Sequence, residues 1–304
     1  MRTSLFTYFH DSLRASPVDD YVHDLRAARD EGFSHAWTVQ LPWDPDALVT
    51  LGIALREVEG MTLGTGVQPI QLRQPMSLAQ AALTLNLIGG GRFRLGIGLT
   101  HALICDGMWG VPWDRPVRRL NEYLDGLQPL LAGEKADATG EIYTTRGNVR
   151  VAGATAPPVY VAAMGPQVLR IAGRRTAGTI TFLTGPRTLA DHVVPTLRAA
   201  AEEAGREAEV VAALPICVTD DAAKVRELAA ETYALYGTLP SYQAMLAREG
   251  AQGPADVALI GDEDAVSARL EEIRAAGVAE FAAHIFGPGD EERARTRALL
   301  RQAA

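Results

Sequence analysis

The amino-acid sequence predicts an α/β barrel in which short strands alternate with helices. Helix, glycine and β-rich run follow one another repeatedly along the 304 residues. A glycine that ends a helix just before a strand is typical of a short αβ loop. Between residues 63 and 101, two strand patterns that each carry Gly-x-Gly flank a helical pattern, and such a unit is a right-handed βαβ crossover. The length suits a single barrel domain spanning residues 1–304.

Eight strands are expected, at residues 5–9, 36–39, 63–67, 93–98, 159–163, 179–183, 210–218 and 280–286. The first helix begins at Ser16-Pro17, and these apolar residues share one of its faces: Val18, Tyr21, Val22, Leu25 and Ala28. The helix between the third and fourth strands begins at Pro75 and ends at Gly89-Gly90-Gly91. Because glycines at strand tips let backbone approach a flat ligand, these two tips are the expected floor of a cofactor site.

Two segments depart from this rhythm and predict insertions after strand 4 and before strand 8. Residues 101–156 should contain a long loop, a helix over 116–131 and a hairpin formed by EIYTT and NVRVAG. Residues 220–256 should contain helices without a strand. Loops that follow barrel strands build the active face, so both insertions are expected to form lids or substrate walls.

Composition excludes several classes of protein. The formal net charge of -8 argues against binding to a nucleic-acid backbone. Two cysteines indicate a reduced protein without a disulfide framework. No apolar run approaches membrane-spanning length and the N-terminus lacks a signal-peptide core. The chain is therefore expected to be cytoplasmic, with no nucleic-acid or membrane partner.

The usual catalytic motifs are absent from the sequence. Gly89-Gly90-Gly91 precedes a strand, whereas a dinucleotide-binding glycine motif follows one. No Walker A, HExxH, paired CxxC or GxSxG motif occurs, and the six histidines lack metal-ligand spacing. No metal site is expected.

Two backbone segments could hold a cofactor. The strand at 159–163 runs into Met164-Gly165-Pro166-Gln167, where a helix begins. Free amides at the start of a helix, beside a glycine, can bind a phosphate. The alternative interpretation of this segment is an ordinary βα turn. A β-bulge at Gly66-Val67 could brace one face of a ring, and a strand glycine packed on a neighbour is the alternative.

Polar and aromatic residues gather at the predicted strand ends. The polar ones are His10, Gln40, Thr100 and His101, and the loops beyond carry Trp43, Trp109 and Trp113. A histidine there could shuttle a proton. His284 and Trp37 are expected in the core, and His23 and His192 on helix surfaces.

Several ordered motifs together resemble the bacterial-luciferase-like superfamily of flavin and deazaflavin oxidoreductases. They are ARDEGFSHAWTV, LGTGV, GGGRFRLGIGLTH, GVPWDRPVRRLNEYLDGLQPLLAG, PPVYVAAMGPQVLRIAGRRTAGTI and ALIGDEDAV, and they cover nearly the whole chain. The branch that uses coenzyme F420, an 8-hydroxy-5-deazaflavin, is the most similar. The resemblance implies a (β/α)8 TIM barrel with insertions, commonly paired into a homodimer.

The resemblance also implies roles for particular residues. Gly66-Val67 matches a bulge, often with a cis peptide, that supports the ring. The phosphate-binding turn matches Met164, Gly165, Pro166, Gln167 and Val168, with Gly178 and Thr179 alongside. Thr100 and His101 match the strand tip that faces the ring. Gln40-Leu41 replaces an acid–histidine pair of many relatives and Gln74 replaces a histidine, which leaves His101 and His10 as the candidate catalytic residues.

The expected reaction is hydride transfer between F420 and a small organic substrate. An FMN-dependent monooxygenase and a catalytically silent flavin-binding homologue are the alternatives. Gln40, Trp43 and Trp109 are the candidate substrate-binding residues. The aromatic residues of segments 101–115 and 233–252, which include Trp113, Tyr236 and Tyr242, either line an apolar pocket or pack the insertions onto the barrel.

Overall fold

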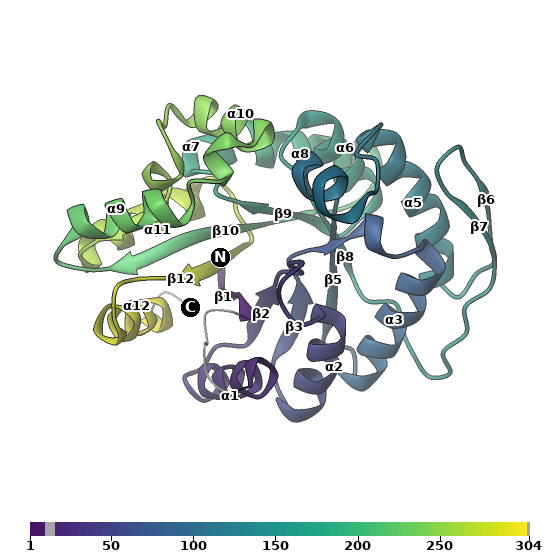
Figure 1. Ribbon diagram of the computed structural model, residues 1–304, viewed down its shortest axis with the longest axis horizontal. Coiled ribbons are helices and arrows are strands. Elements are labelled where there is room, and N and C mark those ends of the chain that lie inside the picture. The colour runs from purple at the N-terminus through teal and green to yellow at the C-terminus, as the bar shows by residue number, and fades with distance from the viewer. Residues whose placement is uncertain (10–15, 303–304) are drawn as a thin grey trace. The chain divides into compact units, whose positions relative to one another are not determined.

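The computed structural model describes residues 1–9 and 16–302 and confirms the predicted (β/α)8 barrel (Figure 1). Its strands follow the order β11-β10-β12-β1-β2-β3-β5-β8-β9, and β10 pairs in addition with β9. The chain divides into two compact units, residues 1–7, 30–37 and 163–304, and residues 8–29 and 38–162. We call them unit 1 and unit 2.

Unit 1 contains parallel strands that pair in register, for example Arg2 with Glu280 and Ala213 with both Phe182 and Ala282. Its strands are β1 (Arg2–Thr7), most of β2 (His35–Thr38), β9 (Gly178–Phe182), β10 (Glu209–Val218), β11 (Leu259–Gly261) and β12 (Glu280–Ile285). Its helices are α6 (Pro166–Arg175), α7 (Pro186–Thr188), η4 (Leu189–Val193), α8 (Val194–Glu203), α9 (Ala222–Thr232), η5 (Tyr236–Thr238), α10 (Pro240–Glu249), η6 (Pro254–Asp256), α11 (Glu263–Ala275) and α12 (Asp290–Gln302).

Unit 2 contains the βαβ unit that the glycine pattern predicts. Its strands are β3 (Thr62–Thr65), β4 (Gln68–Pro69), β5 (Phe93–Gly98), β8 (Val159–Ala162) and the antiparallel pair β6 (Ala136–Thr139) and β7 (Thr144–Gly147). Its helices are α1 (Pro17–Asp30), α2 (Ala47–Glu57), η2 (Ile70–Leu72), α3 (Pro75–Ile88), α4 (Ala102–Ile104), η3 (Cys105–Trp109) and α5 (Pro116–Leu131). In Figure 1, β6 and β7 form a hairpin beyond α5.

Four local expectations were wrong. The first strand is Arg2–Thr7 instead of 5–9, and Phe9 packs on Tyr21 of α1 with ring centroids 4.7 Å apart. The hairpin strands are β6 and β7 instead of EIYTT and NVRVAG. The Glu122 carboxylate accepts hydrogen bonds from the backbone amides of residues 141–143 and so fixes the turn between the two strands. A π-helix, η3, occupies part of the expected loop after strand 4. A further short strand, β11, pairs with β10.

The core of unit 1 includes the expected Trp37 and His284. The Trp37 indole Nε1 donates to Glu280 Oε1 at 2.6 Å, and both side chains are buried. His284 Nδ1 lies 3.2 Å from the Phe6 carbonyl oxygen, so this histidine is a hydrogen-bonded core residue. None of the described helices has the length and apolar character that crossing a bilayer requires.

Candidate functional site

In unit 2, the tip of β3 is built around close backbone contacts. The strand ends at Thr65, the Gly66-Val67 peptide is cis as the resemblance implies, and pairing resumes at β4. The Thr65 hydroxyl donates to the Gly96 carbonyl at 2.7 Å and accepts from the Gly96 amide at 2.9 Å. A Cβ on Gly98 would lie 2.5 Å from Val67 Cγ2. Packing of the bulge against β5 therefore requires glycine at this position.

Two glutamines in the segment after the bulge, Gln68 and Gln71, have buried side-chain oxygens without partners among the described residues. Gln71 donates its Nε2 to the Leu99 carbonyl, which also accepts from Trp113 Nε1 at 3.2 Å. Unpaired buried acceptors are costly, so this segment fits a ligand that carries N–H or O–H donors. Neither residue could be recognised from the sequence, because nothing in the spacing of Gln68 and Gln71 distinguishes them from other glutamines.

Thr100 and His101 lie just beyond the end of β5, as predicted. Thr100 has a φ of 58°, which turns the chain at the strand tip, and His101 is the N-cap position of α4. Loss of solvent around the ring lowers the pKa of His101 below its ordinary value of 6.5. The imidazole is therefore neutral at pH 7 and able to accept a proton. His10, the other candidate catalytic residue, lies outside the described residues.

The candidate substrate-binding residues of unit 2 differ in their surroundings. Gln40 uses its side chain locally, since Oε1 accepts from the Ala47 amide at 2.8 Å and Nε2 donates to the Leu41 carbonyl at 3.1 Å. It therefore holds the start of α2. Trp43 is 60% exposed, and Trp109 is half-buried at the end of η3.

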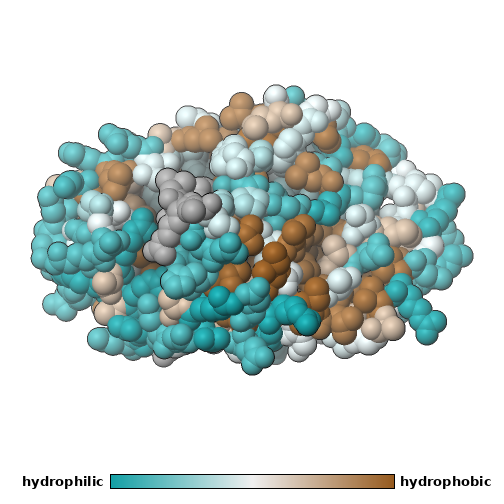
Figure 2. Space-filling model, turned by 60° about the horizontal axis from the view of Figure 1, so that its bottom comes forward, coloured by the Kyte–Doolittle hydropathy of each residue, from teal (hydrophilic) through white to brown (hydrophobic). Residues whose placement is uncertain are grey.

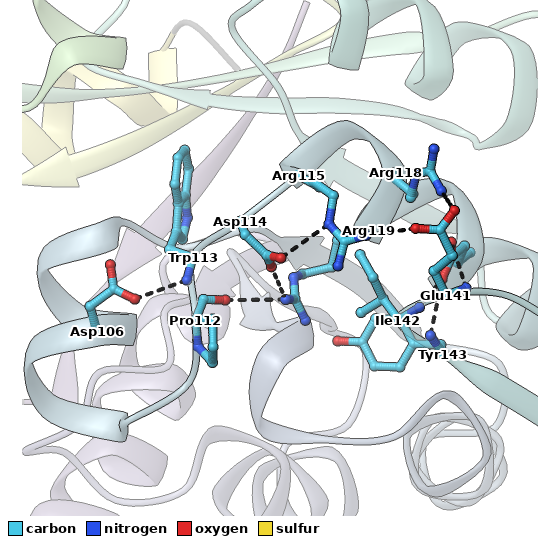
Figure 3. Close-up of polar contacts among 11 residues, drawn as sticks. Asp106, Pro112, Trp113, Asp114, Arg115, Arg118, Arg119, Glu141, Ile142 and Tyr143 are labelled. Atoms are coloured by element: carbon cyan, nitrogen blue, oxygen red, sulfur yellow. Dashed lines mark hydrogen bonds and ion pairs between the residues drawn. The ribbon is translucent and has the colours of Figure 1, made fainter.

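A charged network fastens the insertion after β5 to α5 and the hairpin (Figure 3). Asp114 accepts from Arg119 at 2.6 Å and from Arg115 at 3.1 Å. Arg119 also donates to the Pro112 carbonyl at 3.1 Å, and Arg115 and Arg118 both pair with Glu141. The Arg119 and Arg115 guanidinium groups hold the pKa of Asp114 below its usual range. This network fixes the insertion that begins at His101.

In unit 1, the turn into α6 has the features of an anion site. Gly165 is the N-cap of α6, no side chain caps the helix, and Pro166 occupies its first turn. The first amides of a helix lack partners within the helix and lie at its positive end. Nothing lies within 4 Å of the position that a Gly165 Cβ would take. Gln167 is exposed and Met164 and Val168 are half-buried, so the amides of this turn are accessible to a phosphate.

Two neighbouring side chains hold this turn in place. His192 Nε2 donates to the Met164 carbonyl at 2.8 Å, and Thr179 Oγ1 donates to the Ala163 carbonyl at 3.3 Å. His192 is only 8% exposed, so its expected place on a helix surface was wrong. His23 is exposed as predicted. A Cβ on Gly178 would overlap the Glu209 carbonyl, so Gly178 serves the packing of β9 on β10.

An aromatic cluster lies at the ends of β1, β9 and β12 in unit 1. The Phe182 ring stacks on Phe6 at 5.5 Å and meets the edge of Tyr236 at 5.2 Å. Tyr236 contacts the buried Tyr242 at 5.0 Å. Tyr242 therefore packs one part of the 233–252 segment against another. Phe182 and Tyr236 are half-buried. No group of metal-ligating side chains occurs in the described part of the chain.

The chain is similar to known proteins in sequence and in structure. The family model for luciferase-like monooxygenases matches residues 1–302. A 5,10-methylenetetrahydromethanopterin reductase of Methanolobus tindarius is 29% identical over 258 residues, which are 84% of this chain and 78% of the relative. The structure of the coenzyme F420-dependent tetrahydromethanopterin reductase of Methanopyrus kandleri has a TM-score of 0.81 at 21% identity and covers 99% of this chain and 97% of that one.

A protein whose structure was solved with FMN shares the fold as well. The FMN complex of the oxygenating constituent of 3,6-diketocamphane monooxygenase from Pseudomonas putida has a TM-score of 0.75 at 16% identity and covers 99% of this chain and 96% of that one. The barrel and its matched family define an oxidoreductase of the luciferase-like class, as predicted. The chain belongs to the luciferase-like monooxygenase family.

Proposed function

We propose that this protein is an F420-dependent oxidoreductase that transfers a hydride to or from a small organic substrate. The observation that carries the proposal is the start of α6, where accessible amides beside Gly165 offer hydrogen bonds to the phosphate of a flavin-type cofactor. FMN and F420 share that phosphate. F420 is favoured over FMN by the resemblance of GLTH, AAMGPQ and LIGDEDAV to the deazaflavin branch and by the F420-dependent reductase of the same fold.

Each part of the proposed site would have its own role in binding or in proton transfer. By the resemblance, backbone at Gly66-Val67 and the strand tip at Thr100 of unit 2 would support the ring. In unit 1, the turn at 164–168 with Thr179 would hold the phosphate. When bound, a deazaflavin supplies the carbon that carries the hydride. His101, neutral at pH 7, accepts the proton of an alcohol-type substrate, or returns it in the reverse direction. Trp43 and Trp109 exclude water around the substrate.

Equilibrium binding of oxidised F420 and FMN to the purified apoprotein tests the proposal. Fluorescence titrations should show at least tenfold tighter binding of F420, which corresponds to about 1.4 kcal/mol. Equal or tighter binding of FMN would assign the protein to the monooxygenase alternative. Cofactor binding with no reduction of the oxidised cofactor by a panel of alcohols, and no oxidation of the reduced cofactor by aldehydes and imines, would favour the catalytically silent alternative.

A homodimer is the second part of the proposal, supported by apolar residues on the surface of unit 2. Val49 and Ile53 of α2 are 66% and 39% exposed, although the opposite face of this helix is buried. Leu87 and Ile88 at the end of the neighbouring α3 are also exposed, and Figure 2 shows a hydrophobic patch on one face of the molecule. Exposed apolar residues that gather on one surface typically mark a site that another molecule covers. Sedimentation velocity should show a dimer, and a monomer at micromolar concentration would contradict it.

A further inference from the structure

We infer that Gln68 is a specificity-determining residue for the cofactor ring. Its side-chain amide would accept a hydrogen bond from a ring N–H and donate one to the carbonyl beside it. The inference rests on the proposed function, because it assigns a residue to the same cofactor. It goes further by naming the edge of the ring that the protein recognises.

The position of Gln68 is the first reason. It is the first residue of β4, directly after the Gly66-Val67 bulge, and it pairs with Ile97 of β5. The residue is 1% exposed, yet its Oε1 has no hydrogen-bond partner in the described part of the chain. A polar atom buried in this way costs folding free energy unless something else satisfies it.

Other side-chain amides of unit 2 show that this is not a general feature of the fold. Asn86 is also buried, and its Nδ2 donates to the Thr155 carbonyl at 2.9 Å while its Oδ1 accepts from the Phe93 amide at 3.1 Å. Gln40 likewise uses both ends of its amide. Among the buried side-chain amides in the described part of unit 2, Gln68 and Gln71 have unpaired oxygens, and both lie in the segment that follows the bulge.

The chemistry of the missing partner follows from the acceptor. An amide oxygen needs an N–H or O–H donor or a cation, and the described residues hold no carboxylate cluster that would recruit a metal ion. Flavin and deazaflavin rings share a uracil-like edge, on which N3–H stands between two carbonyls. A carboxamide presents an acceptor and a donor side by side and matches that edge. Recognition of N3–H therefore satisfies Gln68 without any charge in the core.

The test combines one substitution with one altered ligand. Gln68→Met keeps the length of the side chain and removes both polar groups, and Gln80→Met makes the same change at an exposed site on α3. Dissociation constants are measured for F420 and its N3-methyl derivative, or for FMN and N3-methyl-FMN if FMN binds more tightly. Thermal unfolding of each apoprotein is recorded in parallel.

We expect wild-type protein to prefer the parent cofactor over the N3-methyl derivative by at least tenfold. Gln68→Met should weaken binding of the parent by at least tenfold and reduce the preference to below threefold. Its apoprotein should unfold at the same or a higher temperature, because the substitution removes an unsatisfied polar group. Gln80→Met should leave both affinities unchanged.

Three results would overturn the inference. The first is that Gln68→Met binds the parent cofactor as tightly as wild type does, and the second is that it binds both the parent and the N3-methyl derivative more weakly by the same factor. The third is that wild type prefers the parent over the N3-methyl derivative by less than threefold, which is measured without any variant. Wild-type protein that binds neither F420 nor FMN would instead overturn the proposed function, and this inference with it. The two failures are therefore distinguishable.

Discussion

The contact between His192 and the turn before α6 allows a quantitative prediction. His192 Nε2 donates to the Met164 carbonyl at 2.8 Å from a site that is 8% exposed. His192→Phe keeps a ring of similar size and removes the donor. A neutral hydrogen bond contributes a net 0.5–1.5 kcal/mol, and water can reach the half-buried Met164. We therefore expect a loss of about 1 kcal/mol in phosphate binding, which is roughly a fivefold weaker dissociation constant for F420.

The assay must separate the turn from the rest of the protein. F420 and the same deazaflavin without its phosphate are titrated into wild type, His192→Phe and His192→Gln. Only F420 should bind more weakly to the phenylalanine variant, and glutamine, which keeps an N–H donor, should restore part of the affinity. His23→Phe on the exposed surface of α1 is the matched control. Unchanged F420 affinity, or an equal loss for both ligands, would show that His192 only packs the core of unit 1.

Other predictions concern Gly165 and His101. Gly165 has a φ of -75° and open space at its Cβ position, so Gly165→Asp should keep the wild-type circular dichroism spectrum. Its carboxylate should repel the phosphate and weaken F420 binding at least tenfold. The dissociation constant of Gly165→Ala for F420 should stay within threefold of wild type. His101→Ala should slow single-turnover hydride transfer by 10²–10⁴-fold with little change in cofactor affinity, and a change below roughly threefold would make His101 a structural residue. Burial lowers the pKa of His101, so as pH falls through 6.5 the unfolded chain protonates this histidine more readily than the folded protein does. Between pH 7.5 and 5.5, wild type should therefore lose more free energy of unfolding than His101→Ala, as measured by urea denaturation.

Elements with strong local signals were predicted accurately from the sequence. The helices Pro75–Ile88 and Pro116–Leu131 and the strand Phe93–Gly98 match their expected ranges. Proline fixes the first turn of each of these helices, and glycines follow each of them. Such signals act within a few residues, so no tertiary contact was needed to recognise them. The same holds for the interruption at Gly66-Val67, where the Gly-x-Gly pattern marks a close approach to β5.

Features that depend on distant contacts were not predictable in this way. The hairpin depends on Glu122 of α5, which lies 20 and 21 residues before Ile142 and Tyr143, whose amides it binds. His192 lies in the π-helix η4, where the wider turn changes the face that a residue presents, so the 3.6-residue period gave the wrong side. The Arg119 network is likewise invisible to periodicity, because it joins a loop, a helix and a hairpin.

The proposed site residues differ in how they could be found. Glycines and histidines attract notice in a sequence because their backbone freedom or titration suggests chemistry, and Gly165 and His101 were found for that reason. A glutamine is neutral and common, and only the environment shows whether its amide is satisfied. Gln40 and Gln68 illustrate this, because the first came from the sequence and serves the start of α2, whereas the second came from its unpaired oxygen. A binding residue that must wait for a ligand leaves the apoprotein less stable than it could be. Such destabilised positions mark binding residues that motifs do not reveal, because in this family the cofactor supplies the reactive atoms and the protein supplies orientation.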